Sequence, residues 1–100
     1  MLIAVDIDGT LATETHGDYS SCRPFTRRIN RIKRLYRAGH TIWIFTARGG
    51  GHRSLTEAQL KVWGVPYHRL IMDKPKADKF VDDKGINADD FFADTLSSRP

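Results

Sequence analysis

Four sets of polar side chains have the residue types and spacing to act together on one substrate. Asp6 and Asp8 lie directly after an apolar run, with one residue between them. Thr46, Lys74 and the pair Asp82-Asp83 follow along the chain. One carboxylate can attack phosphorus and a second can move protons, while hydroxyl and ammonium groups hold the phosphoryl oxygens. These residue types therefore indicate chemistry on a phosphate group.

The carboxylates also indicate a metal ion. Several carboxylates that share one site repel one another unless a cation lies between them. Hard oxygen ligands suit Mg²⁺, which prefers six oxygen atoms and retains several waters. A zinc site is not indicated, because the histidines lack the spacing of zinc ligands. The expected magnesium ligands are Asp6, Asp8, Asp82 and Asp83.

Each polar set follows a segment with the pattern of a buried strand. Short apolar, β-branched or aromatic runs bounded by turn residues are typical of strands covered on both faces. Such strands are predicted at residues 2–5, 41–45, 67–72 and 79–81. Because the carboxyl ends of parallel strands share one edge of a sheet, the polar sets are expected to meet there.

Helices are predicted between these strands. Pro24 suits a first helical position, Ser54 and Glu57 have the spacing of a capping box, and Asn87 is a good helix cap. The predicted helices run from Pro24 to Gly39, from Ser54 to Gly64 and from Asn87 through Phe92 toward Leu96. Alternating strands and helices predict the α/β class, with a mainly parallel sheet between two helical layers.

The polar sets resemble the four motifs of the haloacid dehalogenase (HAD) superfamily of phosphohydrolases. The matching segments are Asp6-Ile7-Asp8-Gly9-Thr10-Leu11, Thr46, Lys74 and Val81-Asp82-Asp83. The resemblance spans about residues 2–92 and implies a Rossmann-like, three-layer α/β/α catalytic core. We expect one such domain over residues 1–96, followed by a frayed tail at 97–100.

The resemblance implies a role for each matched residue. Asp6 would attack phosphorus to form an aspartyl-phosphate, and Asp8 would act first as general acid and then as general base. The backbone carbonyl of Asp8 would bind Mg²⁺ beside the carboxylates of Asp6 and Asp82. Asp83 would complete the metal shell, directly or through water.

Substrate would be held by further residues of the same motifs. Thr46 and Lys74 are expected to bind the oxygens of the phosphoryl group in transfer. Additional substrate contacts are expected from Gly9, Thr10, Ala47 and Arg48.

The chain has no room for the cap domain that HAD enzymes usually insert. The intervals from Asp8 to Pro24 and from Thr46 to Lys74 are too short for one. The sequence therefore resembles capless members, most of all small phosphatases of capsule and polysaccharide biosynthesis. We expect a phosphorylated small molecule, such as a sugar phosphate, as substrate. A homo-oligomer could close the open site.

The distribution of charge leaves two alternatives open. The net charge is +4, yet nine basic residues and no acidic one occur between Tyr19 and Thr56. This basic segment, centred on Arg23 to Arg37, could bind nucleic acid or another polyanion through its phosphates, or could be a solvated helix face. The alternatives to a sugar-phosphate phosphatase are a polynucleotide phosphatase and a non-catalytic, HAD-like binding module.

Composition bounds the setting in which the protein works. A hydrophobic fraction of 40% and a charged fraction of 28% are those of a globular domain. The single cysteine, Cys22, cannot form an internal disulfide, which favours a reducing, cytoplasmic compartment. No apolar run reaches the length of a membrane span or of a signal-peptide core, so no membrane partner is expected.

Overall fold

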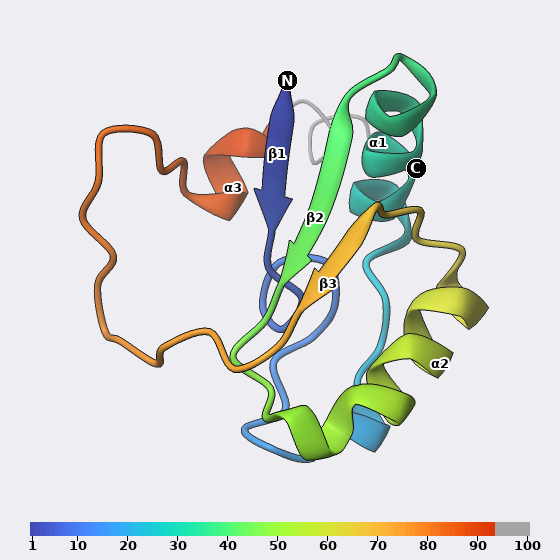
Figure 1. Cartoon of the computed structure of the whole chain (residues 1–100), viewed down its shortest axis with the longest axis vertical. Coiled ribbons are helices and arrows are strands. Elements are labelled where there is room, and N and C mark those ends of the chain that lie inside the picture. The colour runs from blue at the N-terminus through green and yellow to red at the C-terminus, as the bar shows by residue number, and fades with distance from the viewer. Residues whose placement is uncertain (94–100) are drawn as a thin grey trace.

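The computed structural model describes residues 1–93 and confirms the α/β class (Figure 1). The predicted domain end at 96 and the frayed tail at 97–100 lie outside these residues. The elements are β1 (Leu2–Val5), η1 (Tyr19–Ser21), α1 (Thr26–Arg37), β2 (Thr41–Phe45), η2 (Gly50–His52), α2 (Arg53–Trp63), β3 (Arg69–Ile71) and α3 (Ala88–Phe91). Within 1–93, no helix has the length and apolar character needed to cross a membrane.

The three strands form a parallel sheet in the order β1-β2-β3. The register pairs Ala4 with Trp43 and Trp43 with Arg69. Both crossovers move in the same direction across the sheet, so right-handed connections bring α1 and α2 to the same face. The second helical layer that the sequence predicts does not occur within residues 1–93.

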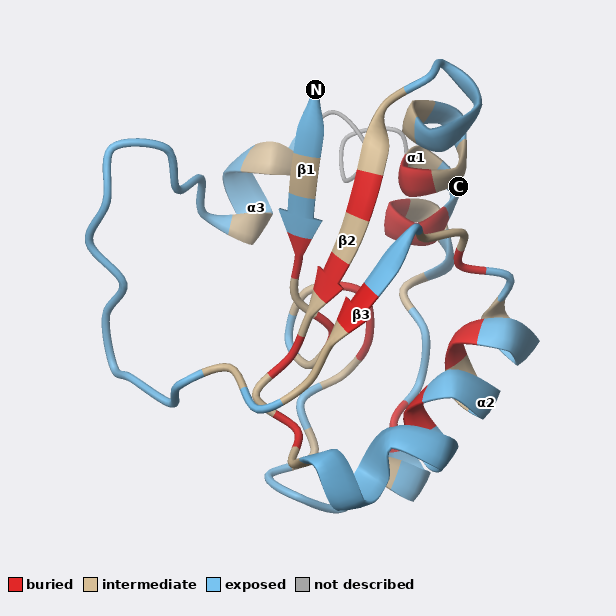
Figure 2. Ribbon diagram, in the orientation of Figure 1, coloured by how far each residue is buried: buried red, intermediate tan, exposed pale blue. Residues whose placement is uncertain are grey.

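The core lies between this face of the sheet and the helices. Ile42 and Ile44 of β2 are fully buried, and they form one cluster with Ile32 of α1 and Leu60 of α2. Buried and half-buried residues alternate along β2 because successive side chains point to opposite faces (Figure 2). The alternation shows that one face of β2 is fully buried and the other is only partly covered.

Two predicted helix starts are wrong by a few residues. Pro24 precedes α1 because it forms an isolated antiparallel bridge with Ala12 instead. The capping box at Ser54 is absent, because η2 runs directly into α2 and His52 becomes the cap, with no side-chain bond. The predicted helix end is confirmed: Gly64 takes a left-handed conformation with φ +72°.

The predicted strand at 79–81 is wrong. Residues 74–87 contain no helix or strand and swing away from the sheet, on the far side of β1 (Figure 1). A three-residue run has few backbone bonds to offer, and it is followed by a turn in which Asp82 accepts hydrogen bonds from the backbone N–H groups of Lys84 and Gly85. As a result, β1 is an edge strand in the described sheet.

Candidate functional site

Asp6 and Asp8 lie in a tight turn that begins where β1 ends. Ile7 between them is fully buried, and its carbonyl accepts the N–H groups of Leu11 at 2.8 Å and Ala12 at 3.1 Å. Gly9 has a φ of +81°, a conformation that side chains with a Cβ rarely adopt. The buried Ile7 therefore fixes the turn, and each neighbouring carboxylate has its own surroundings.

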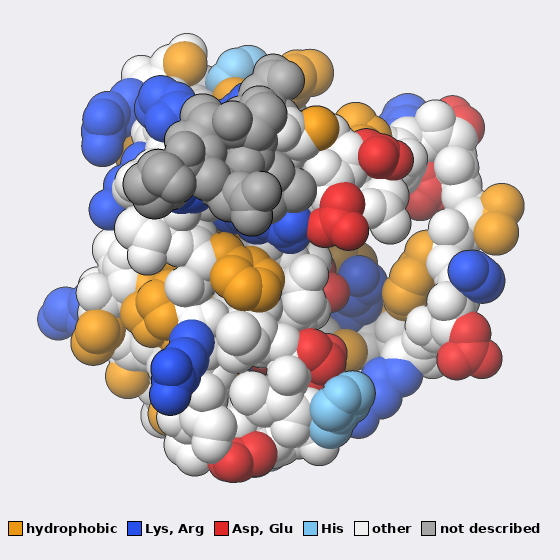
Figure 3. All heavy atoms as spheres, turned by 180° about the vertical axis from the view of Figure 1, so that it is seen from behind, with side chains coloured by type: hydrophobic (Ala, Val, Ile, Leu, Met, Phe, Trp, Pro, Cys, Tyr) orange, Lys and Arg blue, Asp and Glu red, His pale blue; other side chains and the backbone are white. Residues whose placement is uncertain are grey.

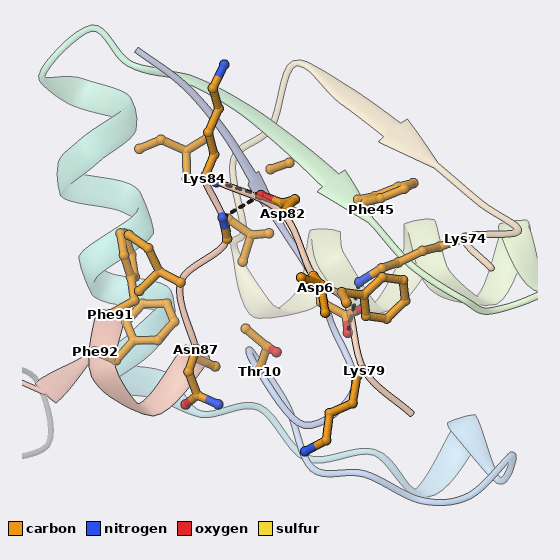
Figure 4. Close-up of a pocket in the computed structure, with 18 of the residues that line it drawn as sticks. Asp6, Thr10, Phe45, Lys74, Lys79, Asp82, Lys84, Asn87, Phe91 and Phe92 are labelled. Atoms are coloured by element: carbon orange, nitrogen blue, oxygen red, sulfur yellow. Dashed lines mark hydrogen bonds and ion pairs between the residues drawn. The ribbon is translucent and has the colours of Figure 1, made fainter. Parts of the chain in front are cut away.

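Asp6 faces Lys74 on the side of the turn that borders a cavity, which we call the open side. The Lys74 ammonium lies 4.0 Å from Oδ2 of Asp6, whose side chain is 35% exposed (Figure 4). Burial raises the pKa of Asp6, and the Ile7 N–H and Lys74 offset only part of that effect. The Lys74 ammonium also lies 5.3 Å from the ring centre of Phe45 and 4.4 Å from that of Phe80. An ammonium so placed can meet an anion that approaches Asp6.

The loops after β2 and β3 hold Lys74 in place. The Lys74 N–H donates to the Thr46 carbonyl and the Asp73 N–H to the Arg48 carbonyl, both at 2.9 Å. Asp73 adopts a left-handed conformation, with φ +63°, and its carboxylate accepts the Gly50 N–H at 3.2 Å. The strained residue thus joins the two loops immediately before the lysine.

Asp8 belongs to a buried network rather than to the open side. Arg48 donates two hydrogen bonds to the Asp8 carboxylate, from Nε to Oδ2 at 3.0 Å and from Nη2 to Oδ1 at 2.9 Å. The side chains of Asp8 and Arg48 are 12% and 0% exposed. The third Arg48 nitrogen donates to Thr56 Oγ1 at 3.0 Å and Gln59 Oε1 at 2.6 Å. Burial opposes the Arg48 charge, but the bonds to Asp8 outweigh it and raise the Arg48 pKa.

Two more residues close this network. The Tyr19 ring centre lies 4.5 Å from the Arg48 guanidinium, and the Tyr19 carbonyl accepts Gln59 Nε2 at 2.6 Å. Cys22 is buried with Sγ 3.4 Å from Asp8 Oδ1, and burial together with that contact raises the pKa of its thiol. Sequence reasoning missed Thr56 and Gln59; their spacing of three residues on one helix face was the available signal.

The remaining predicted substrate contacts differ in access. Thr46 is fully buried, and its hydroxyl accepts the Arg48 N–H at 3.2 Å. Thr10 lines a cavity beside Asp6, whereas Gly9 is exposed in the turn and Ala47 is half-buried. Arg48 directs its guanidinium to Asp8, Thr56 and Gln59, so a direct contact with substrate stays a prediction for this residue.

The structure does not bring Asp82 and Asp83 to the other carboxylates. Asp82 lines the same cavity as Asp6, about 1140 Å³ in volume, but from the segment 74–87 (Figure 4). The N–H groups of Lys84 and Gly85, at 2.6 and 2.7 Å, lower the pKa of Asp82. Among residues 1–93, no three Asp, Glu, His or Cys side chains are placed to hold a metal ion. The donors fit Mg²⁺ in chemistry, as hard oxygens, but not in number.

Comparison with known proteins gives a fold and no family. No protein-family model matches the sequence, and no curated protein matches it. A crystallised target from Vibrio cholerae aligns over 96% of this chain and 94% of its own, with a TM-score of 0.75 and 20% identity. A chain of the Pnkp1/Rnl/Hen1 complex aligns over 92% of this chain and 33% of its own, with a TM-score of 0.63 and 20% identity. At such identity the likeness establishes the fold alone.

Proposed function

We propose that this protein hydrolyses phosphate monoesters through a covalent aspartyl-phosphate on Asp6. One observation carries the proposal: a half-buried carboxylate with a raised pKa faces an ammonium at 4.0 Å, at the carboxyl edge of a parallel sheet and beside a large cavity. We propose further that the chain is a capless member of the HAD superfamily, on the strength of its motifs and of this placement of Asp6, Asp8, Thr46 and Lys74.

The chemistry takes two steps. In the first, an Asp6 carboxylate oxygen attacks phosphorus, the bond from phosphorus to the ester oxygen breaks, and Asp8 gives the departing alcohol the proton that it took from water in the previous turnover. In the second, water attacks the same phosphorus, Asp8 takes a proton from it, and the bond from phosphorus to Asp6 breaks. Lys74 stabilises the phosphoryl oxygens in both steps because its charge already lies beside Asp6.

The hydrogen bonds from Arg48 determine how Asp8 can act as general acid and general base. Both Asp8 oxygens accept bonds from Arg48, which holds the carboxylate in one orientation. A carboxylate offers about four lone-pair sites, so each oxygen retains one for a proton or for a substrate atom. Arg48 is in this account a positioning residue, and Thr56 and Gln59 position Arg48 in turn.

We propose that Mg²⁺ is the cofactor, held by Asp6, the Asp8 backbone carbonyl and Asp82, with Asp83 near it. When bound, the ion supplies positive charge to the phosphoryl oxygens. Asp82 would have to approach Asp6 within the cavity that both residues line.

Asp6 and Lys74 recognise the phosphate group of the ester, but they do not determine which alcohol the ester carries. A sugar phosphate and a polynucleotide end both satisfy Asp6 and Lys74, so the substrate class depends on surfaces beyond these residues. We further propose a reducing, cytoplasmic setting, because the one cysteine is a buried free thiol.

A phosphate-release screen tests this function. The panel contains an aryl phosphate, sugar phosphates, nucleotides and 3′-phosphorylated oligonucleotides, each with and without Mg²⁺. We expect Mg²⁺-dependent release that is lost in Asp6→Asn and kept in the matched control Asp90→Asn, an exposed carboxylate on α3. Failure of every ester to release phosphate would favour the non-catalytic binding module.

A further inference from the structure

The sheet has a second face that the described helices leave uncovered. The side chains opposite to the core belong to alternate residues of each strand. They are Leu2, Ala4, Thr41, Trp43, Phe45, Arg69 and Ile71. We call this set the open face. In the ribbon of Figure 2, no helix of residues 1–93 lies in front of the sheet.

Aromatic rings and cations alternate on the open face. The register places Trp43 beside Arg69, and the Arg69 guanidinium lies 4.9 Å from the Trp43 ring centre. One row further, Phe45 has the Lys74 ammonium 5.3 Å from its ring centre. Within the described residues, the core forms on the helix side and leaves Trp43 and Phe45 outside it. Aromatic rings beside cations are the groups that bind stacked bases and their phosphates.

The open face leads to the proposed phosphoryl site. Asp6 lies two residues after Ala4, on the same side of β1, and its carboxylate is 4.0 Å from Lys74. The cavity that contains Asp6 and Lys74 also extends along Leu2 and Ala4 and past Phe45. A ligand anchored at Asp6 by its phosphate can therefore continue over the sheet.

The charges on the open face distinguish a long ligand from a short one. Lys74 lies at the phosphoryl site, whereas exposed Arg69 lies in the row of Ala4 and Trp43, two residues along the strands from the row of Phe45. Two residues along a strand span roughly 6.6 Å, so one small monophosphate does not use both cations. A chain with repeated phosphates and planar groups between them uses both cations and both rings.

We propose that the open face binds the bases of a single-stranded oligonucleotide whose terminal phosphate enters the site at Asp6 and Lys74. The direction of the chain rests on the proposed function, while the binding itself does not require turnover. The α1 arginines lie behind the sheet, where Lys and Arg side chains gather in Figure 3. They are a competing surface and serve as the control.

Binding is measured by fluorescence anisotropy on the wild-type protein without added Mg²⁺. The probe is a labelled single-stranded hexadeoxynucleotide with a 3′-phosphate, and its matched partner is an abasic strand of equal length and charge. We expect the abasic strand to bind at least roughly tenfold more weakly, because stacking is lost. Equal affinity of the two strands would overturn the proposal.

Variants locate the binding surface. Trp43→Leu is expected to weaken binding by roughly tenfold. Arg69→Gln is expected to reduce the salt dependence by about 0.7 in log–log slope, the value for one phosphate contact on a single strand. Arg37→Gln, also an exposed arginine but on α1, is the matched control and leaves affinity within about twofold.

The outcomes separate this proposal from the proposed function. Loss of binding in Arg37→Gln but not in Arg69→Gln would overturn it in favour of the α1 surface. Dimerisation that Trp43→Leu abolishes, with no oligonucleotide binding, would overturn it in favour of a second copy of the chain. Release of phosphate from sugar phosphates, with no oligonucleotide bound, would leave the phosphatase standing and remove this inference alone.

Discussion

The two carboxylates of one short motif lie in opposite surroundings. Asp8 is 12% exposed and has a guanidinium on both oxygens, whereas Asp6 is 35% exposed and has one ammonium at 4.0 Å. Around Asp8, Thr56 and Gln59 of α2 accept hydrogen bonds from Arg48 and shut out solvent; we call this the closed side. The side of Asp6 opens on a large cavity beside residues 74–87.

The two carboxylates are therefore expected to contribute differently to stability and to catalysis. A buried ion pair is costly to break because the remaining partner is left without compensation, so the Asp8 side is part of the fold. A long, partly exposed pair such as Asp6 and Lys74 contributes less to stability and can exchange partners with a substrate. We therefore expect substitutions on the Asp8 side to act first on stability and those on the Asp6 side to act first on turnover.

The largest effect is expected at Asp6. Asp6→Asn removes the proposed nucleophile, and phosphate release should fall by at least about a thousandfold. Because burial raises the Asp6 pKa, its charge disfavours the folded state above that pKa. The melting temperature of Asp6→Asn should thus exceed that of wild type at pH 7. At pH 3 the two melting temperatures should agree, because Asp6 of the wild type is then largely protonated in the folded and the unfolded state. A loss of stability at pH 7 would contradict the described surroundings of Asp6.

The next effect tests the closed side. Arg48→Met leaves the Asp8 carboxylate buried without a partner and should lower the free energy of unfolding by about 3–5 kcal/mol in urea titrations. The double variant Arg48→Met/Asp8→Asn should recover part of that loss, because no charge then remains. A change below about 1 kcal/mol would show that the Asp8 side is not part of the fold.

The matched substitution on the open side should do the reverse. Lys74→Gln is expected to lower kcat/KM for an aryl phosphate by about a hundredfold, since one donor to the phosphoryl oxygens is lost. Its free energy of unfolding should stay within about 1 kcal/mol of wild type, because the pair with Asp6 is long and partly hydrated. Equal losses of stability in the Lys74 and Arg48 variants would break the comparison.

Cys22 reports on the closed side through its reactivity. Burial and the Asp8 contact raise the pKa of the Cys22 thiol, so little thiolate forms at pH 7. Alkylation by iodoacetamide should be at least about tenfold slower than in urea-unfolded protein at the same pH. Equal rates in the two states would mean that the network around Asp8 opens readily.

The smallest effect concerns pH. Without Mg²⁺, the Asp6 carboxyl should titrate with a pKa above the ordinary 3.8 of an Asp, measured by carbon NMR. Lys74 lowers the Asp6 pKa, so Lys74→Gln should move this titration to higher pH, while Arg37→Gln should leave it in place. A shift to lower pH in Lys74→Gln would contradict the contact between the two residues.

Local pattern was enough to predict most of the framework. The strands at 2–5 and 41–45 are strongly apolar and agree with β1 and β2 to the residue. Gly64 and Asn87 end and begin helices as expected, because each acts through its own backbone or side chain. The approach of Lys74 to Asp6 also followed from the sequence, since parallel strands share a carboxyl edge.

What the sequence could not predict depends on contacts between distant segments. The network around Arg48 could not be predicted, because a loop arginine beside a motif has no visible partner in the sequence. Its actual partners are Asp8 and Gln59, which lie 40 and 11 residues away along the chain. The strand expected at 79–81 failed for the same reason: a run of three residues pairs only if tertiary contacts favour it.

Detection of the covalent intermediate on Asp6 is the decisive test of the proposed mechanism. Wild-type protein is mixed with an aryl phosphate and Mg²⁺, quenched in acid within the first turnover, and examined by peptide mass spectrometry. The account predicts one phosphoryl adduct on Asp6, removed by hydroxylamine and absent in Asp6→Asn. Phosphate release without an adduct on Asp6, or an adduct on another residue, would contradict it.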